Sequence, residues 1–390
     1  MGIYRLKNEI KNYSWGSEDL LFKYFGIENP QKRPQAEMWM GAHPGAPSQL
    51  IGLDKDLLTF IRESPEKTLG EYCAKKFNGE LPFLFKILSA KVPLSIQAHP
   101  DKTQAKNGFD RENESGIALN DPNRNYKDNN HKPEIICALS EFWAMNGFRP
   151  PKEINENFKI LAPGVLPELT KNLLSDNDYK TFFLKLMTID KGAAKQALNS
   201  AIAWAENASS DEARWILEIS GLYPDDIAVL SPLYLNLVKL KSGQAMYLGA
   251  GRLHAYLSGI GVELMANSDN VLRGGLTNKH MDIQELSRVL KFESSAVNII
   301  LPSLSESEDF EEYVVPGDEF NLKYLDSHYF STSLNEKGPQ ILLCQNGEAI
   351  LKEGDKVIEI NSGVSVFISP SENNISMAGN GKYFMAGVPV

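Results

Sequence analysis

The sequence is poor in cysteine and has no block of basic residues. It contains three cysteines among 390 residues, and Cys73, Cys137 and Cys344 are isolated from one another. This spacing excludes a disulfide framework and a cysteine zinc site, and it favours a reducing cytoplasm. The 50 acidic residues outnumber the 40 basic ones, for a net charge of −10. We expect no nucleic-acid partner, because phosphate binding usually leaves a basic patch.

Long apolar runs are also absent from the sequence. No run is long enough to span a bilayer, and Lys7, Glu9 and Lys11 interrupt the apolar core that a signal peptide would need. A hydrophobic content of 42% beside 23% charged residues is typical of a globular protein, and 390 residues suit two or three domains. We expect a cytoplasmic protein with no membrane contact.

The spacing of apolar residues divides the chain into β-rich and helical blocks. Short strands separated by Gly- and Pro-containing turns occur in the first part of the chain, and they resume after Leu233. Between these blocks the apolar period changes from about two to about 3.6 residues, which indicates helices. The sequence therefore predicts a mainly β fold with an α-helical insertion. The predicted domains are 1–150 with 233–290 (catalytic, β), 151–232 (inserted, helical) and 291–390 (C-terminal, β).

Turn and cap signals refine this division. Asn346–Gly347, Gly354–Asp355 and Ser362–Gly363 each separate two short strands in the manner of hairpin turns, and this favours a β-sandwich or jelly roll. Ser209 with Glu212 three residues later predicts a capping box. The polar segment 101–130 predicts a long exposed loop with one short helix.

Four residues in separate segments have the chemistry of a metal site. Gln97 and His99 alternate along a predicted strand and so share one face. Glu134 follows Pro133, which cannot donate to a ladder and indicates an edge or a cavity, and His254 lies in the later β block. Two imidazoles, one carboxylate and one amide oxygen suit an open Zn²⁺ site that favours an oxyanion. Alternatively, His99 is a core residue and Glu134 a solvated charge.

A second group of polar residues lies downstream of His254. Arg273 and Lys279 bracket the pair Gly274–Gly275, which allows the backbone to approach a ligand. An arginine and a lysine so placed suit a phosphate dianion. The alternative is an Asp269–Arg273 ion pair that stabilises the turn.

Three further ionisable residues are less informative. Lys86 lies in the middle of an apolar run, so a buried strand would place it at a sheet edge or in a pocket. His43 and His328 have no acidic residue at useful spacing, and we assign them structural roles.

Several long blocks together resemble one known family. They are NYSWG, EMWMGAHP, LPFLFKIL, PLSIQAHPDK, HKPEI, LHAYLSG and VELMANSDNVLRGGLTNKH, in that order over nearly the whole chain. The chain resembles the type I mannose-6-phosphate isomerases, which are zinc-dependent members of the cupin superfamily. The resemblance implies two cupin-like jelly-roll domains with a helical domain, and the interconversion of mannose 6-phosphate and fructose 6-phosphate by a monomer.

The resemblance also implies site residues. It assigns one zinc ion per chain to the four residues that suit a metal, and an active-site arginine to Arg273. Its metal ligands fall on Gln97, His99, Glu134 and His254. Its other catalytic candidates fall on Asp269, Glu263, Lys132 and His131, and its substrate or phosphate contacts on Lys279, Lys86, Arg273 and Trp15. The chain departs from the family at Asn278, where proline is common, and at Arg252–Leu253 before His254.

Aldose–ketose isomerisation requires ring opening, proton transfer between C1 and C2, and stabilisation of an enediolate. Our hypothesis assigns charge stabilisation to Arg273, the phosphate to Lys279 or Lys86, and a share in proton transfer to Asp269 or Glu263. The base itself stays open among Asp269, Glu263, His131 and Lys132. Two other functions compete with this one: a non-catalytic sugar-phosphate-binding metal cupin, and an iron-dependent cupin oxygenase.

Overall fold

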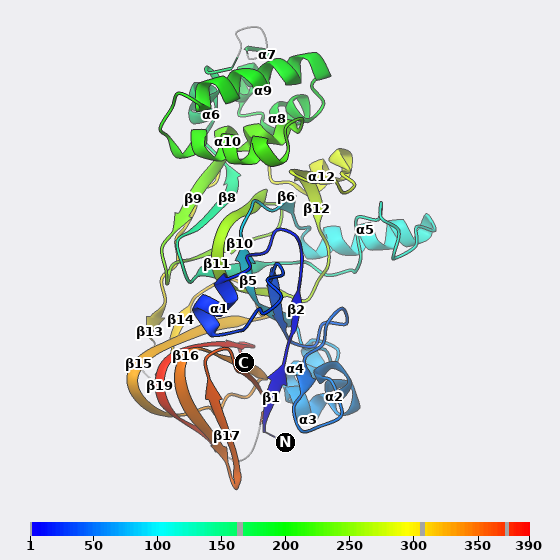
Figure 1. The fold of residues 1–390 in the computed structure, drawn as a ribbon. Helices are drawn as coiled ribbons and strands as arrows, with labels where there is room; N and C mark the ends of the chain where they lie inside the picture. The colour runs from blue at the N-terminus through cyan, green and yellow to red at the C-terminus, as the bar shows by residue number, and fades with distance from the viewer. Residues whose placement is uncertain (1, 162–166, 305–308, 371–373) are drawn as a thin grey trace.

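The structure is a computed structural model that describes residues 2–161, 167–304, 309–370 and 374–390. Its described part consists of two antiparallel sheets and a helical region, which stack in one direction in Figure 1. The helices α6 to α10 lie at one end, the first sheet lies in the middle, and the second sheet lies at the other end with both termini beside it. This confirms a mainly β fold with a helical region. Among the described residues, no helix is both long and apolar enough to cross a bilayer.

The first sheet carries most of the candidate site residues. Its strands are β2 (Glu9–Lys11), β3 (Glu37–Met40), β5 (Phe83–Ala90), β6 (Ile96–Ala98), β7 (Glu134–Ala138), β8 (Phe142–Phe148), β9 (Leu235–Leu240), β10 (Ala245–Leu248), β11 (His254–Ala266) and β12 (Leu272–Gly275).

The long strand β11 joins the two parts of this sheet. Its first residues pair with β6 and β8, and its last residues pair with β5 and β7. The register shifts between Tyr256 and Ser258, and Gly259 follows with φ at 119°. A Cβ atom at Gly259 would lie 2.7 Å from the carbonyl oxygen of Glu141, so glycine allows this close approach. One strand therefore carries both His254 and Glu263.

The second sheet contains the C-terminal strands and two early strands. It consists of β1 (Ile3–Lys7), β4 (Gln49–Leu50), β13 (Ser303–Leu304), β14 (Glu311–Tyr313), β15 (Asn321–Ser333), β16 (Gln340–Glu353), β17 (Lys356–Asn361), β18 (Ser365–Ile368) and β19 (Ile375–Gly387). β1 pairs with β18 and with β4. Both early strands fall within the predicted catalytic domain, so its N-terminal part does not follow the predicted boundary. The three-domain division otherwise stays a prediction.

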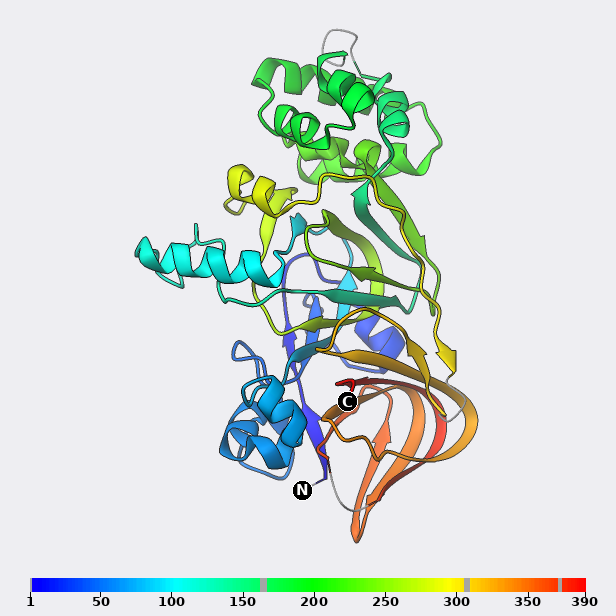
Figure 2. The same cartoon turned by 180° about the vertical axis from the view of Figure 1, so that it is seen from behind.

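Helices cover the first sheet at one end and flank both sheets. They are α1 (Leu20–Phe25), α2 (Leu57–Glu63), α3 (Pro65–Leu69), α4 (Glu71–Lys76), α5 (Lys102–Glu114), α6 (Pro151–Phe158), α7 (Pro167–Asp176), α8 (Tyr179–Met187), α9 (Lys191–Ala205), α10 (Asp211–Leu222), the 3₁₀ helix η1 (Ile227–Leu230), α11 (Ser231–Tyr234) and α12 (Ile283–Val289). Figure 2 shows α2 to α4 beside the second sheet.

The helical region shares its core with the strands that carry the site. Phe182 and Leu186 of α8 are fully buried, and they belong to the same apolar cluster as Phe148 of β8 and Leu272 of β12. Burial of each such side chain contributes about 1.5–3 kcal/mol. This packing supports the end of the first sheet where β6, β11 and β12 meet.

Two of the turn and cap predictions were wrong in detail. β16 continues through Asn346–Gly347 without a turn: its register against β19 shifts just before, between Cys344 and Asn346, and Gly347, with φ at 94°, is paired with Gly381 of β19. The turns at Gly354–Asp355 and Ser362–Gly363 do separate strands. The cap predicted at Ser209 is one residue later, since Ser210 accepts from the backbone N–H of Ala213.

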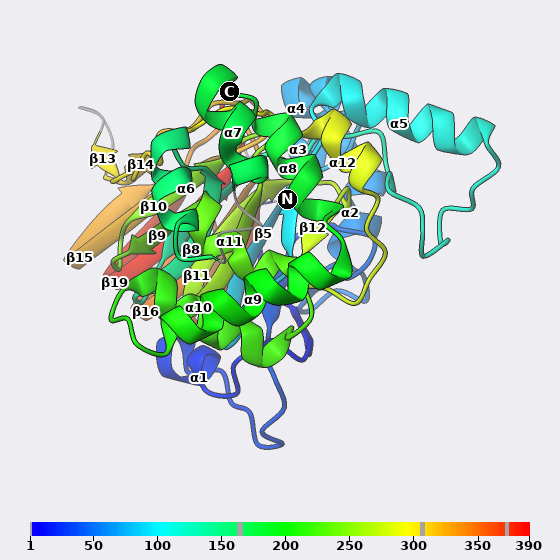
Figure 3. The ribbon, with the colours of Figure 1, turned by 90° about the horizontal axis from the view of Figure 1, so that it is seen from above.

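The expected short helix within 101–130 is longer than predicted. α5 has 13 residues and begins with a reciprocal capping box between Asp101 and Gln104. It projects away from the body of the molecule in Figure 3. Its polar composition hid it, because an exposed helix has only a narrow apolar stripe.

Candidate active site

Three side chains with metal-binding atoms meet inside the first sheet. His99 follows β6, Glu134 begins β7, and His254 begins β11. One ligand atom from each lies within 4.8 Å of the others, and each residue is 1% exposed. The site thus brings together three segments that are distant in sequence.

Backbone carbonyls determine which ring nitrogen of each histidine carries the proton. Nδ1 of His99 lies 2.7 Å from the carbonyl oxygen of Asn270, and Nδ1 of His254 lies 2.9 Å from that of Arg252. A carbonyl only accepts, so each Nδ1 is the donor and each Nε2 of a neutral ring presents a lone pair. The fully buried Asn270 is itself held by bonds from its amide to the backbone oxygens of Asp128 and Asn130.

These lone pairs face a carboxylate. His99 Nε2 lies 3.4 Å from Glu134 Oε1, and His254 Nε2 lies 3.5 Å from Glu134 Oε2. Among the described residues, His99 Nε2, His254 Nε2 and Glu134 Oε2 have no hydrogen-bond partner. Burial without a partner costs several kcal/mol, so the arrangement needs a cation between the three atoms. Two imidazoles, one carboxylate and hydrogen-bonded outer nitrogens fit zinc.

The ionisation of the site agrees with this requirement. Burial, followed by the Lys132 ammonium, lowers the pKa of His99 to about 4. Burial alone would raise the pKa of Glu134, but the Lys132 ammonium, together with the contacts from the His99 and His254 rings, outweighs burial and holds that pKa well below its usual value. Lys132 Nζ lies 2.9 Å from Glu134 Oε1. At neutral pH the site therefore consists of a neutral His99 and an ionised Glu134.

Gln97 lies at the edge of the same group. In the register of β6, Gln97 is opposite His254 on one side and opposite Arg273 of β12 on the other. Directly opposite residues in antiparallel strands point to the same face. Gln97 is half-buried and links the metal-binding residues to the arginine.

A buried cluster of charges lies further along β11. Lys86 Nζ lies 3.2 Å from Glu263 Oε2 and 3.6 Å from Glu37 Oε1, and the Trp39 indole donates to Glu37 at 2.7 Å. Burial lowers the pKa of Lys86, but Glu37 and Glu263 outweigh it and raise the pKa overall. Burial also raises the pKa of Glu263, against the opposing charge of Lys86. Of the two expected places for Lys86, the sheet edge is wrong, because β5 is an interior strand that pairs with β3 and β11.

Asp269 contacts a histidine that the sequence did not single out. His43 Nε2 lies 3.3 Å from Asp269 Oδ2. Because His43 Nδ1 accepts from the backbone N–H of Gly45 at 3.0 Å, its proton is on Nε2 and is donated to Asp269. This hydrogen bond lowers the pKa of Asp269. His43 therefore has an acidic partner that its spacing in the sequence did not indicate.

Arg273 and Lys279 form a pair of unneutralised cations. Within the described part of the chain, no ion pair joins Asp269 to Arg273, and neither cationic side chain has a hydrogen-bond or ion-pair partner. Burial lowers the pKa of Arg273, and burial together with Arg273 lowers the pKa of Lys279. Two neighbouring cations without a counter-charge favour an anionic ligand.

The comparisons with known proteins agree with this site. Residues 3–151 match the family described as phosphomannose isomerase type I, catalytic domain. Mannose-6-phosphate isomerase of Escherichia coli K12 is 40% identical over 97% of each chain, and that of Salmonella typhimurium is 39% identical over 97% of each chain. The chain belongs to the type I phosphomannose isomerase family. A crystal structure of a zinc-bound mannose 6-phosphate isomerase covers 100% of both chains with a TM-score of 0.92 and 37% identity.

Two residues for which the resemblance implies a role in the site contact residues other than the metal-binding ones. The His131 ring lies 2.5 Å from Glu319 of the second sheet's β14–β15 connection. Trp15 stacks on Tyr13 with ring centroids 5.8 Å apart and packs against the apolar cluster that contains Tyr256. Their expected roles in catalysis and substrate binding stay predictions.

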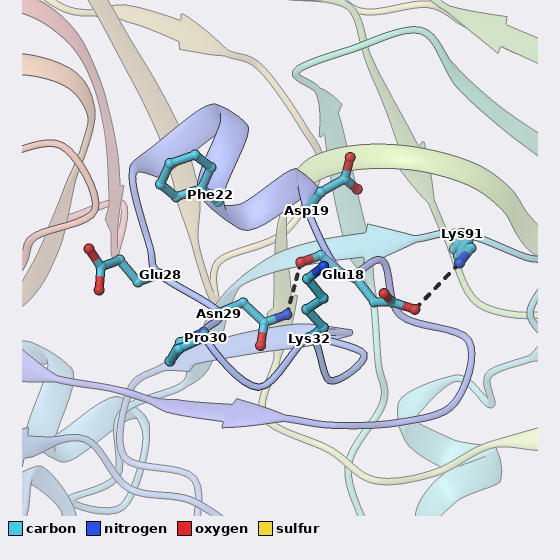
Figure 4. Close-up of a pocket in the computed structure, with 8 residues that line it drawn as sticks. All are labelled: Glu18, Asp19, Phe22, Glu28, Asn29, Pro30, Lys32 and Lys91. Carbon is cyan, nitrogen blue, oxygen red and sulfur yellow. Dashed lines mark hydrogen bonds and ion pairs between the residues drawn. The ribbon is translucent and has the colours of Figure 1, made fainter.

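A large surface groove contains none of the candidate site residues in its lining. It has a volume of about 770 Å³ beside α1 and the segment that follows it, as Figure 4 shows. Glu18 spans it with an ion pair to Lys91 at 3.6 Å, and Asn29 donates to the Glu18 backbone at 2.8 Å. The groove is lined mainly by exposed side chains and contains no fully buried polar group.

Sequence reasoning missed the contribution of the segment around β3. Glu37 and Trp39 alternate on this short strand, and His43 follows it. The block EMWMGAHP contained the signal, since an acid two residues from a tryptophan shares its face in a strand. The contact of His43 with Asp269 depends on tertiary packing, so the spacing of residues in the sequence did not indicate it.

Proposed function

We propose that the protein is a zinc-dependent aldose–ketose isomerase that interconverts D-mannose 6-phosphate and D-fructose 6-phosphate through an enediol(ate). One observation carries the proposal: the buried imidazole and carboxylate donors require a cation, and Arg273, which has no partner among the described residues, lies opposite Gln97 in the register next to them. His99, Glu134 and His254, with Gln97 as the fourth ligand, would hold one zinc ion. When bound, zinc would polarise a sugar oxygen as a Lewis acid.

In this proposal Lys279 binds the phosphate and Arg273 stabilises the charge of the enediolate. Lys86 is a weaker candidate for the phosphate because two carboxylates already neutralise it. Lys279 is exposed and lacks a counter-charge, so it suits a phosphate dianion. Arg273 lies opposite Gln97, which brings its charge near the metal-binding residues, where an enediolate would form.

Glu263 and Asp269 divide the acid–base work. The raised pKa of Glu263 suits a group that accepts a proton from one carbon and returns it to the next. Asp269 is held ionised by His43, and its side chain is 55% exposed, so it can accept a hydrogen bond from a sugar hydroxyl. Lys132 keeps Glu134 ionised, whereas the His131 ring points to Glu319.

The proposal also covers the cellular compartment, the oligomeric state and the partners of the enzyme. We place it in the cytoplasm, as a monomer that acts on a small phosphosugar without nucleic acid or membrane partners. Cys73, Cys137 and Cys344 are buried free thiols, which agrees with a reducing compartment. Light scattering of the purified protein measures the predicted monomer mass directly.

The test is product formation by the zinc-loaded protein. Mannose 6-phosphate is supplied, and fructose 6-phosphate is measured by a coupled assay, with oxygen uptake recorded in parallel. We expect fructose 6-phosphate to form without oxygen uptake. Tight binding of the phosphosugar with no product would establish the non-catalytic binder instead, and iron-dependent oxygen uptake would establish the oxygenase.

A further inference from the structure

A loop of the second sheet contacts the segment that leads into the metal-binding strand β7. Glu319, in the connection between β14 and β15, accepts a hydrogen bond from the His131 ring, with 2.5 Å between Oε1 and Nε2. The side chains are 16% and 24% exposed, so water competes little for this contact. The contact joins residues that are 188 positions apart in the chain.

His131 is coupled through the backbone to a metal ligand. It immediately precedes Lys132, and Pro133 keeps Lys132 in an extended conformation. Neighbouring side chains of an extended segment point to opposite sides. Lys132 reaches Glu134 Oε1 at 2.9 Å on one side, while the His131 ring is held by Glu319 on the other. Anchoring one side chain therefore restricts the other.

The same loop makes a second contact that serves as a reference. Asp318 pairs with Lys76 of α4 at 3.0 Å, and its side chain is 73% exposed. This ion pair also joins the second sheet's loop to the N-terminal half of the chain, but it does not lead to a metal ligand. The loop thus makes one contact that leads to the metal-binding residues, through Glu319, and one that does not, through Asp318.

We propose that Glu319 is a positioning residue of the isomerase: it holds His131 so that Lys132 stays on Glu134. The second sheet, which supplies none of the metal-binding residues, contributes to the active site in this way. The inference rests on the proposed function. Outer partners of metal sites typically alter affinity or activity about 10- to 100-fold when removed, and we expect the lower end for Glu319 because it acts through two residues.

Three variants of the zinc-loaded enzyme test the proposal. Glu319→Ala should lower kcat about 10-fold with KM and melting temperature unchanged, whereas Asp318→Ala should keep wild-type kcat. Glu319→Gln retains an acceptor oxygen for His131 and should keep more activity than Glu319→Ala. Equal kcat in Glu319→Ala and Asp318→Ala, or equal losses in the Ala and Gln variants of Glu319, would overturn the proposal.

A double-mutant cycle and a crystal structure complete the test. If Glu319 acts through His131, adding Glu319→Ala to His131→Ala should lower kcat no further, and additive losses would contradict the proposal. In crystals of Glu319→Ala, Lys132 Nζ should lie beyond the roughly 4 Å limit of an ion pair with Glu134. An unmoved Lys132 overturns this inference whatever the activity. An inactive wild-type enzyme overturns the proposed function instead.

Discussion

Replacing His254 with alanine should release the metal and leave the fold intact. His254 is 1% exposed and is held by the Arg252 carbonyl, so its ring enters the site in one orientation. Zinc bound by four ligands in zinc fingers gains roughly 10–16 kcal/mol, or about 2.5–4 kcal/mol per ligand. At about 1.4 kcal/mol per factor of ten, the loss of one imidazole should weaken zinc binding about 10²- to 10³-fold.

Zinc affinity is measured by competition with a chelating dye, and zinc content by mass spectrometry after dialysis. His328→Ala is the matched control, because His328 is an exposed histidine on β15 of the second sheet. Zinc at about 100 times its Kd should stabilise the wild type and the control by ~2.7 kcal/mol, and His254→Ala far less. Wild-type zinc affinity in His254→Ala would refute the metal site.

Three further predictions concern the cations and the pH dependence. Arg273→Ala should lower kcat about 10²- to 10³-fold with little change in KM, as loss of a transition-state contact does; a rise in KM alone would make Arg273 a phosphate anchor. Lys279→Ala should raise KM about 10-fold for mannose 6-phosphate but leave slow turnover of unphosphorylated mannose unchanged, and equal losses on both sugars would contradict its phosphate role. The metal-free protein should lose stability as pH falls from 6.5 to about 4. Folding lowers the pKa of His99 from 6.5 to about 4, so the unfolded chain binds more protons than the folded chain in that range. Urea unfolding across this range should show a smaller slope in His99→Gln, and identical slopes would refute the buried neutral imidazole.

The residues of the metal site were visible in the sequence, but the reason they need a metal was not. The alternation of Gln97 and His99 and the position of Pro133 before Glu134 indicated side chains that face a cavity. The orientation of His99 depends on the Asn270 carbonyl, which comes from a loop 171 residues away. Such a contact arises from the pairing of β6 with β11 and β12, and the residue spacing within β6 alone does not identify these partner strands.

The fold was predictable where the apolar period within one segment identifies the element. It was less predictable where an early strand pairs with strands from the C-terminal part of the chain. The helical block has a clear 3.6-residue pattern, and α8 buries the apolar side chains Phe182 and Leu186 as this pattern requires. β1 is a five-residue strand with only Ile3 and Leu6 buried, so nothing local assigns it to β18 rather than to its neighbours in the chain. Gly347 has the positive φ that a turn would also use, and only the pairing of β16 with β19 on both sides of Gly347 shows that the strand continues.

Zinc titration of the chelator-stripped protein, followed by isomerase rate, tests the central claim most directly. The account predicts that the stripped protein is inactive and that the formation of fructose 6-phosphate rises in proportion to bound zinc until one ion is bound per chain. Glu134→Gln should show no such recovery, because it lacks the carboxylate that faces both imidazoles. Full turnover by stripped protein that contains no metal would contradict the account.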